Sequence, residues 1–303
     1  MASPVTPSHL LSLLDRINIW SRGSERAPHK PLLLLYALAR CQQGEPRRIP
    51  FRTVDERLTA LLREFGPSRK SYHPEYPFYR LQADNLWELD DTRDLLVRES
   101  NTDPRKSELL KQDIHGGFPE PVQQLLTDNP QLIVQAAQKI LEAHFPSTLH
   151  DDLASAVGLD LATFETHRRR KRDPNFRTEV IRAYAYRCTV CGYDIQLEDQ
   201  SVGIEAAHIK WHQAGGPSVV PNGLALCALH HKLFDRGAFT LGSELRLEVS
   251  EHAHGGESFE QHILRFHGEA TRPPISEDYL PNKKFLEWHR DQVFRKPARS
   301  MAE

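Results

Sequence analysis

Apolar residues in the first half of the chain recur at three- and four-residue intervals, the spacing of a buried helical face. Four segments have this pattern: residues 8–20, 28–44, 54–66 and 131–145. Ser8 is the predicted N-cap of the first segment. In the second segment, Pro31 lies in the first turn and Gly44 follows the last one, as is typical of helix ends. The sequence therefore predicts a helix-rich first half.

Strand-like patterns lie mainly in the second half. After a helical segment at 176–188 come an apolar run at 203–209, a Gly- and Pro-rich loop at 213–223, and a strand-then-helix pattern at 224–237. Two alternating segments, 238–241 and 245–249, flank a Gly-Ser-Glu turn and predict a hairpin. In the first half, residues 76–89 alternate aromatic and polar positions, which predicts a strand or a short strand pair. The order of elements indicates an α+β protein.

The chain is long enough for two domains. It has 303 residues, and a domain commonly takes about 100–200. Residues 168–172 are five consecutive basic residues, which we interpret either as a solvated linker or as a hinge that contacts phosphates. We expect domains at residues 1–165 and 176–303, joined by a basic linker at 166–175.

Composition restricts the class of protein. Hydrophobic residues make up 39% and charged residues 26%, as in an ordinary soluble globular protein. No apolar run reaches the roughly 20 residues of a membrane span, and the N-terminus lacks the pattern of a signal peptide. These features predict a cytoplasmic protein with no membrane partner. Because the formal net charge is -2, a nucleic-acid partner would have to be bound by local basic patches.

The four cysteines are unevenly spaced. Cys41 follows a helical run and is most simply a small buried apolar residue. Cys188 and Cys191 have a two-residue gap, which Cys227 and His230 repeat. Three thiolates and one imidazole form a closed tetrahedral Zn²⁺ site, and close cysteine spacing in a cytosolic chain favours metal over a disulfide. The alternative is three unrelated buried cysteines beside a stray histidine.

The segment that contains the cysteines also carries a pattern of His, Asn and His. His208 ends the apolar strand, Asn222 lies in a Pro-Asn-Gly turn, and His231 lies one turn into the following helix. Together with the cysteine pairs, this order resembles the HNH endonucleases, in their zinc-bearing branch, over residues 188–239. The resemblance implies a ββα-metal domain that hydrolyses DNA phosphodiester bonds.

The same resemblance implies a role for each residue of the pattern. His208 would be the general base that takes a proton from water, and His231 a ligand of a catalytic Mg²⁺ or Mn²⁺. Asn222 has two readings: it ligates this metal, or its turn fixes the loop that orients His208. The chain departs from the family at Ala207, where many members carry a further ligand. Glu205 is nearby and is a candidate for this ligand. Strand alternation places it on the face opposite His208, but a bulge could bring it round.

Three other residues of this helix have less specific readings. Lys232 and Arg236 either contact phosphate or form a solvated face. Asp235 is more simply a structural residue at the helix end.

The first half resembles the sulfur-binding domain of phosphorothioate-dependent restriction endonucleases. The likeness rests on residues 22–38, 72–89 and 142–159 and covers about residues 5–160. With the HNH half, the architecture resembles a type IV restriction enzyme that cuts sulfur-modified double-stranded DNA, with a homodimer as one possible assembly. A sulfur atom on the backbone is large and poorly hydrated, so its pocket should be apolar and aromatic, with cations close by.

Several polar-aromatic clusters of the first half fit such a pocket. The candidates are Arg26, His29, Lys30, Arg69, Lys70, Tyr72, His73, Tyr76, Pro77, Phe78 and Arg80. For any single aromatic residue, a place in the core is the simpler reading. Two other functions compete: an HNH nuclease that reads methylated cytosine or unmodified sequence, and a DNA-binding protein whose catalysis is weak because Ala207 leaves the metal poorly held.

Overall fold

The fold is taken from a computed structural model. It describes residues 5–20, 25–90, 92, 95–98, 103–161, 174–198, 200–242 and 244–300. Contacts divide the chain into two compact units. The described residues of the first unit are 5–20 and 27–161, and those of the second are Glu25, Arg26 and everything from residue 174 onward. The basic run 168–172 lies outside the described residues, so the domain boundaries near it stay a prediction.

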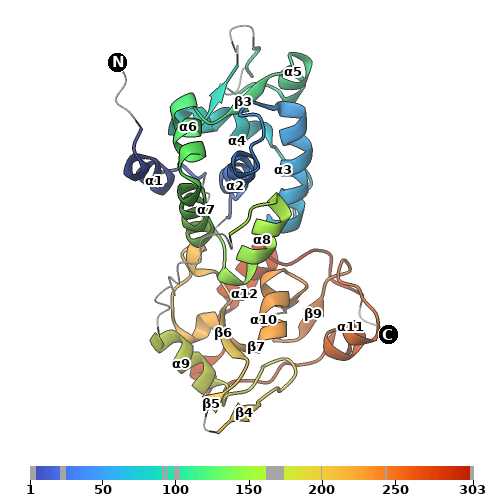
Figure 1. The fold of residues 1–303 in the computed structure, drawn as a ribbon. Helices are drawn as coiled ribbons and strands as arrows, with labels where there is room; N and C mark the ends of the chain where they lie inside the picture. The colour runs from blue at the N-terminus through green and yellow to red at the C-terminus, as the bar shows by residue number, and fades with distance from the viewer. Residues whose placement is uncertain are drawn as a thin grey trace. The chain divides into compact units, whose positions relative to one another are not determined.

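The first unit is helical, as predicted (Figure 1). Its helices are α1 (Pro7–Asp15), α2 (His29–Gln42), α3 (Phe51–Phe65), α4 (Glu75–Arg80), α5 (Lys106–Lys111), α6 (Glu120–Asp128), α7 (Pro130–His144) and α8 (His150–Val157). All four helices predicted from apolar spacing are confirmed. The predicted N-cap of the first was wrong: Thr6, not Ser8, accepts the hydrogen bond of the His9 amide, at 3.2 Å.

Helix α2 is the centre of this unit. Its ten buried residues run from Pro31 to Cys41 with one interruption, and the helix packs against α3, α4, α6, α7 and α8. Cys41 is buried, as predicted. A small antiparallel sheet lies at one end of the unit, formed by β1 (Ile49–Pro50), β3 (His115–Gly117) and β2 (Glu88–Leu89) in that order.

The strand predicted at residues 76–89 was wrong for most of its length. Helix α4 is followed by a 3-10 turn (Leu81–Asp84), and only Glu88 and Leu89 form a strand. Phe78 and Leu81 are three residues apart and both fully buried, which is helical spacing. The aromatic alternation had therefore masked a short helix.

The second unit holds the predicted series of elements. Its helices and strands are α9 (Pro174–Ala183), β4 (Gln196–Leu197), β5 (Gln200–Ser201), β6 (Ile204–His208), β7 (Gly223–Cys227), α10 (Ala228–Asp235), β8 (Phe239–Leu241), β9 (Leu247–Val249), α11 (Glu257–His262) and α12 (Lys283–Gln292). Strands β6 and β7 are antiparallel, in a register that pairs His208 with Gly223. The predicted β8–β9 hairpin is confirmed.

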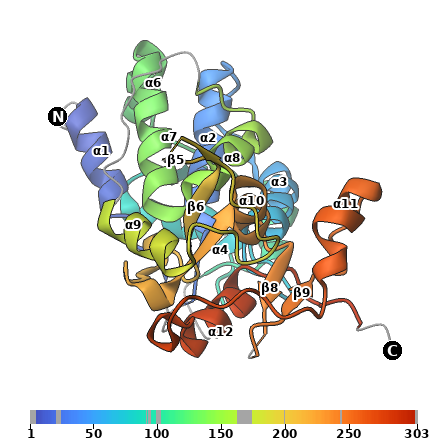
Figure 2. The ribbon, with the colours of Figure 1, turned by 90° about the horizontal axis from the view of Figure 1, so that it is seen from below.

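Helices α9 and α10 both pack on the β6–β7 pair, and strand β6 lies between them in both views (Figures 1 and 2). Gly223 allows the close approach of α9. A Cβ at this position would lie 2.4 Å from Val180 and 3.1 Å from Phe176. Since Phe176 also stacks on His208 at 3.9 Å, this contact fixes one face of the His208 ring.

Helix α12 is tied to the end of α10 by a buried histidine. His289 donates through Nε2 to the Phe234 carbonyl at 3.1 Å, while its Nδ1 lies 2.9 Å from the Thr240 hydroxyl. Burial lowers the pKa of His289 to about 4, so the ring is neutral at pH 7. Across the described ranges, no helix is both long and apolar enough to cross a membrane.

Candidate functional site

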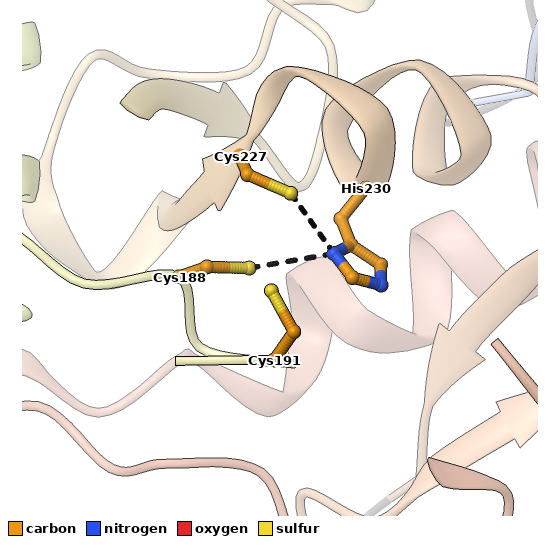
Figure 3. Close-up of side chains that lie close together, drawn as sticks. All are labelled: Cys188, Cys191, Cys227 and His230. Carbon is orange, nitrogen blue, oxygen red and sulfur yellow. Dashed lines mark hydrogen bonds between the residues drawn. The ribbon is translucent and has the colours of Figure 1, made fainter. Parts of the chain in front are cut away.

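The four predicted zinc ligands lie together (Figure 3). The ligand atoms of Cys188, Cys191, Cys227 and His230 all lie within 4.8 Å of one another. The Cys227 sulfur is 3.1 Å and the Cys188 sulfur 3.6 Å from His230 Nδ1. A tetrahedral centre with Zn–S bonds of about 2.3 Å places neighbouring ligand atoms roughly 3.5–4 Å apart. The cluster therefore fits a structural zinc ion with little rearrangement.

The surroundings of this cluster suit metal binding. His230 Nε2 donates to the His262 carbonyl at 2.9 Å, which leaves Nδ1 free to point at the three sulfurs. All four cysteines are free thiols, so the alternative of a Cys188–Cys191 disulfide is not present. Contacts among the thiols lower the pKa of Cys188 and raise the pKa of Cys227, because the first group to lose its proton is stabilised by the two others.

His208 lies at the end of β6, where its ring is half-buried. Beside the stacked ring of Phe176, its Nε2 lies 3.3 Å from the Ser218 hydroxyl. The His212 ring is 6.0 Å away and exposed. His208 thus has a fixed ring plane and remains accessible, which suits a general base.

Asn222 is fully buried, and its side chain hydrogen-bonds to backbone groups. Its Oδ1 accepts from the Lys210 amide at 2.8 Å, and its Nδ2 donates to the carbonyls of Lys210 and Pro217. The Ile209 amide in turn donates to the Asn222 carbonyl. These bonds clamp the loop that directly follows His208. Of the two readings of Asn222, this geometry favours the loop over the metal.

His231 faces two carboxylates. Its Nδ1 lies 2.6 Å from Glu205 Oε2, and its Nε2 lies 3.3 Å from Asp235 Oδ2. Burial alone would lower the pKa of His231, but Asp235 and then Glu205 raise it to about 9. Glu205 lies on the strand face opposite His208, as predicted. That face is shared by Ala207, so Glu205 can supply an oxygen where Ala207 cannot.

The sequence did not predict which side chains hydrogen-bond to His231 and Asp235. Trp211 donates through Nε1 to Asp235 at 3.0 Å, and nothing in the spacing of Trp211 indicated this. The contact between His231 and Asp235 could have been found, because the two residues are four apart on one helix.

Most of the candidate sulfur-reading residues lie around the start of α4. Arg69 and Lys70 are exposed, and Tyr72 and His73 are half-buried. Tyr76 stacks on His73 with their ring centroids 5.1 Å apart. This group presents aromatic rings next to two exposed cationic side chains.

Two arginines cover the Tyr76 ring. The Arg80 guanidinium carbon lies 4.8 Å and that of Arg98 5.1 Å from the ring centroid. Arg98 also donates to the Tyr76 hydroxyl at 2.6 Å, and Arg80 donates to buried Asp103 at 3.0 Å. The Tyr76 ring is thus held in one orientation.

The remaining candidates differ in accessibility. Burial, together with the nearby His73 and Arg69, lowers the pKa of His29 to about 4. Lys30 is engaged by Asp84 at 2.5 Å and by the Asn18 carbonyl at 2.8 Å. His29 is thus a neutral group beside this cluster. Lys30 would have to break its ion pair with Asp84 before it could contact DNA.

Two of the candidates are buried, and a third belongs to the other unit. Phe78 is fully buried, 4.9 Å from the ring of Phe51, and Pro77 is also buried. Arg26 belongs to the second unit, where its guanidinium lies 4.1 Å from the Trp211 ring centroid.

The second unit has the architecture of an HNH endonuclease domain: His208 ends the first of two antiparallel strands, Asn222 lies in the turn before the second strand, and His231 lies on the following helix. The HNH endonuclease family model matches residues 188–242. The chain belongs to the family of the ScoMcrA-like DNA sulfur-binding domain, whose model matches residues 7–162, just over half of the chain. It thus joins a DNA sulfur-binding domain to an HNH endonuclease domain, which hydrolyses DNA phosphodiester bonds.

Solved structures show related domains. The sulfur-binding domain of ScoMcrA complexed with phosphorothioated DNA is 23% identical, with a TM-score of 0.44, over 49% of this chain and 94% of that chain. The corresponding domain of SprMcrA, also complexed with phosphorothioated DNA, is 26% identical, with a TM-score of 0.42, over 51% and 95%. The type IV phosphorothioation-dependent restriction endonuclease ScoMcrA is 22% identical, with a TM-score of 0.42, over 49% of this chain and 32% of that one. No curated protein matches the sequence.

Proposed function

We propose that this protein is a modification-dependent restriction endonuclease: the first unit binds phosphorothioated DNA, and the HNH unit cuts a phosphodiester bond near the modification. The observation that carries the proposal is the joining of the two domains in one chain. An HNH unit has few groups with which to select a sequence, so the domain attached to it supplies the selectivity. DNA inside the cell is the substrate, and we expect the protein to act in the cytoplasm.

For sulfur recognition, we assign the contact surface to the residues around Tyr76. The half-buried rings of Tyr72, His73 and Tyr76 offer an apolar surface to a weakly hydrated sulfur. Arg69 and Lys70, both exposed, provide charge for the phosphate backbone. Arg80 and Arg98 hold the Tyr76 ring in place before DNA arrives, which lowers the entropic cost of binding.

Replacing Tyr76 with alanine should remove the preference for sulfur. Affinity for phosphorothioated DNA should fall about thirtyfold or more, since truncating an aromatic hot-spot residue costs about 2 kcal/mol or more. Affinity for plain DNA and its dependence on salt should change little, because no phosphate contact is lost. Fluorescence anisotropy with the two duplexes over a range of salt concentrations measures both quantities.

Two variants serve as controls for that experiment. Tyr76→Phe keeps the ring and should keep the preference. Lys70→Ala should lower the affinity for both duplexes equally. It should also reduce the slope of log affinity against log salt concentration by about one. If Tyr76→Ala lost affinity equally for both duplexes, the surface that contacts sulfur would have to lie elsewhere.

For catalysis, we assign His208 as the general base and His231, with Glu205, as protein ligands of a Mg²⁺ or Mn²⁺ ion. When bound, such an ion polarises the phosphate and stabilises the negative charge on the leaving oxygen. His208 accepts the proton of the attacking water, and its stacking on Phe176 fixes the plane in which it does so. Asn222 holds the loop after His208 in place. The pairing of Glu205 with His231 argues against the view that Ala207 leaves this metal poorly held.

A double-strand break requires two such cuts. One HNH centre cleaves one strand at a time, so either two copies of the chain pair as a homodimer or two cuts follow each other. We expect nicked DNA to accumulate and persist at low enzyme concentration, as followed on a supercoiled phosphorothioated plasmid. Complete double-strand cutting in one binding event by a demonstrated monomer would contradict this.

A further inference from the structure

The two ring nitrogens of His231 have different surroundings. Nδ1 faces Glu205, whose side chain is 37% exposed, whereas Nε2 faces Asp235, whose side chain is 2% exposed. A Mg²⁺ or Mn²⁺ ion at a nuclease centre keeps several water ligands and must also reach a DNA phosphate. Of these two carboxylates, Glu205 is the one in contact with solvent, so we take the Nδ1 side as the one that water and substrate reach.

The Asp235 carboxylate is already fully engaged. Its Oδ1 accepts the indole N–H of Trp211 at 3.0 Å, and its Oδ2 lies at hydrogen-bonding distance from His231 Nε2. Trp211 is itself fully buried, between the guanidinium of Arg26 and the ring of Trp288. A buried carboxylate with both oxygens in use is placed to orient a neighbour rather than to bind a hydrated ion.

Arg26 packs on Trp211 and hydrogen-bonds to α12. Its guanidinium lies 4.1 Å from the Trp211 ring centroid and donates to the Gln292 carbonyl at 2.8 Å. The Arg26 amide also donates to the Gln292 side chain at 2.9 Å. These bonds fix Arg26 to α12, so Trp211 has little freedom to turn its N–H away from Asp235.

We propose that Asp235 is a positioning residue of the nuclease centre. It accepts the Nε2–H of His231 and so leaves Nδ1 as the nitrogen that, together with Glu205, binds the catalytic cation. Trp211 fixes Asp235 through its N–H, and Arg26 holds Trp211 in place. The inference rests on the proposed role of His231, and it gives Asp235 and Arg26 functions that differ from those expected from the sequence.

Nitrogen NMR of the full-length protein tests which ring nitrogen binds metal. The protein is labelled with ¹⁵N-histidine, carries its structural zinc, and receives a second equivalent of Zn²⁺ as the probe ion; His231→Gln identifies the signal. The expected result is a metal-induced shift of Nδ1, while Nε2 keeps its proton. A metal-induced shift of Nε2 would overturn the proposal, because Asp235 would then be on the metal side of the ring.

Metal affinity of matched variants gives a second test. Asp235→Asn keeps the shape of its side chain, and Trp211→Phe removes the N–H donor while keeping an aromatic ring. Loss of such an outer hydrogen bond commonly weakens metal binding by about 10–100-fold. We expect a loss in this range for Asp235→Asn and a smaller loss for Trp211→Phe, measured as free Mn²⁺ by electron paramagnetic resonance. His254→Gln, which replaces an exposed histidine outside this set of contacts, should leave Mn²⁺ affinity unchanged.

The outcomes separate the inference from the proposed function. Unchanged Mn²⁺ affinity in both Asp235→Asn and Trp211→Phe, with the fold intact by circular dichroism, would overturn the positioning role alone. Absence of Mn²⁺ binding by the wild-type protein, beyond the Cys188–His230 cluster, would contradict the proposed nuclease centre itself.

Discussion

Replacing His208 with alanine is expected to abolish DNA cleavage. A general base contributes about 10²–10⁴-fold to the reaction rate, and His208 is the residue to which we assign this role. His208 acts on water in the transition state and contributes little to ground-state binding. Affinity for DNA should therefore stay close to the wild-type value. Single-turnover cleavage and equilibrium binding, measured on one duplex, separate the two effects.

His212 provides a matched control for this variant. It is exposed, and its ring lies 6.0 Å from that of His208, so His212→Ala removes a neighbouring imidazole without touching the proposed base. We expect it to cleave at nearly the wild-type rate. If His208→Ala cut at that rate too, the base would have to be another residue.

Replacing Cys227 with serine is expected to unfold the second unit. Structural zinc binding is worth about 10–16 kcal/mol in small zinc domains, comparable with the whole stability of a typical domain, about 5–15 kcal/mol. Cys227 ends β7 and begins the helix that carries His230 and His231, so loss of the metal releases both histidines. Elemental analysis should give one zinc per chain for the wild type and less for the variant, whose soluble yield should fall.

Cys41 is the control cysteine, because it is buried in the first unit and lies outside the zinc cluster. Cys41→Ala should keep one zinc per chain and keep nuclease activity. A wild-type protein that is folded and active with no zinc would refute the structural role of the cluster.

Local patterns in the sequence predicted much of this site. The two-residue gaps of Cys188–Cys191 and Cys227–His230 predicted a cluster that the structure confirms, because each pair is held by one short turn. The order of strand, loop, strand and helix around His208 and His231 was confirmed as well. Short-range geometry dominates in both cases, so spacing along the chain was sufficient.

Contacts made over long distances in the chain could not be predicted in this way. Arg26 looked like part of a basic-aromatic cluster, yet its partners Trp211 and Gln292 lie far along the chain. Lys30 was expected near DNA, but Asp84 engages it. Such pairings depend on tertiary packing, which a single sequence does not encode in any local pattern.

Helix and strand patterns were confused where prolines interrupt them. Residues 76–89 alternate aromatic side chains, but Pro74 starts a helix that buries Phe78 against Phe51. In short segments the two periodicities overlap, and packing decides between them.

Cleavage of matched duplexes tests the central claim most directly. Two DNA duplexes of one sequence, one with a single phosphorothioate linkage and one without, are incubated with the wild-type protein and Mg²⁺ or Mn²⁺ over a range of salt concentrations. The expected result is metal-dependent cutting near the modification in the first duplex and little cutting of the second. Equal cutting of both duplexes at every salt concentration would contradict sulfur-dependent restriction. It would not contradict the assignment of nuclease activity to the HNH unit.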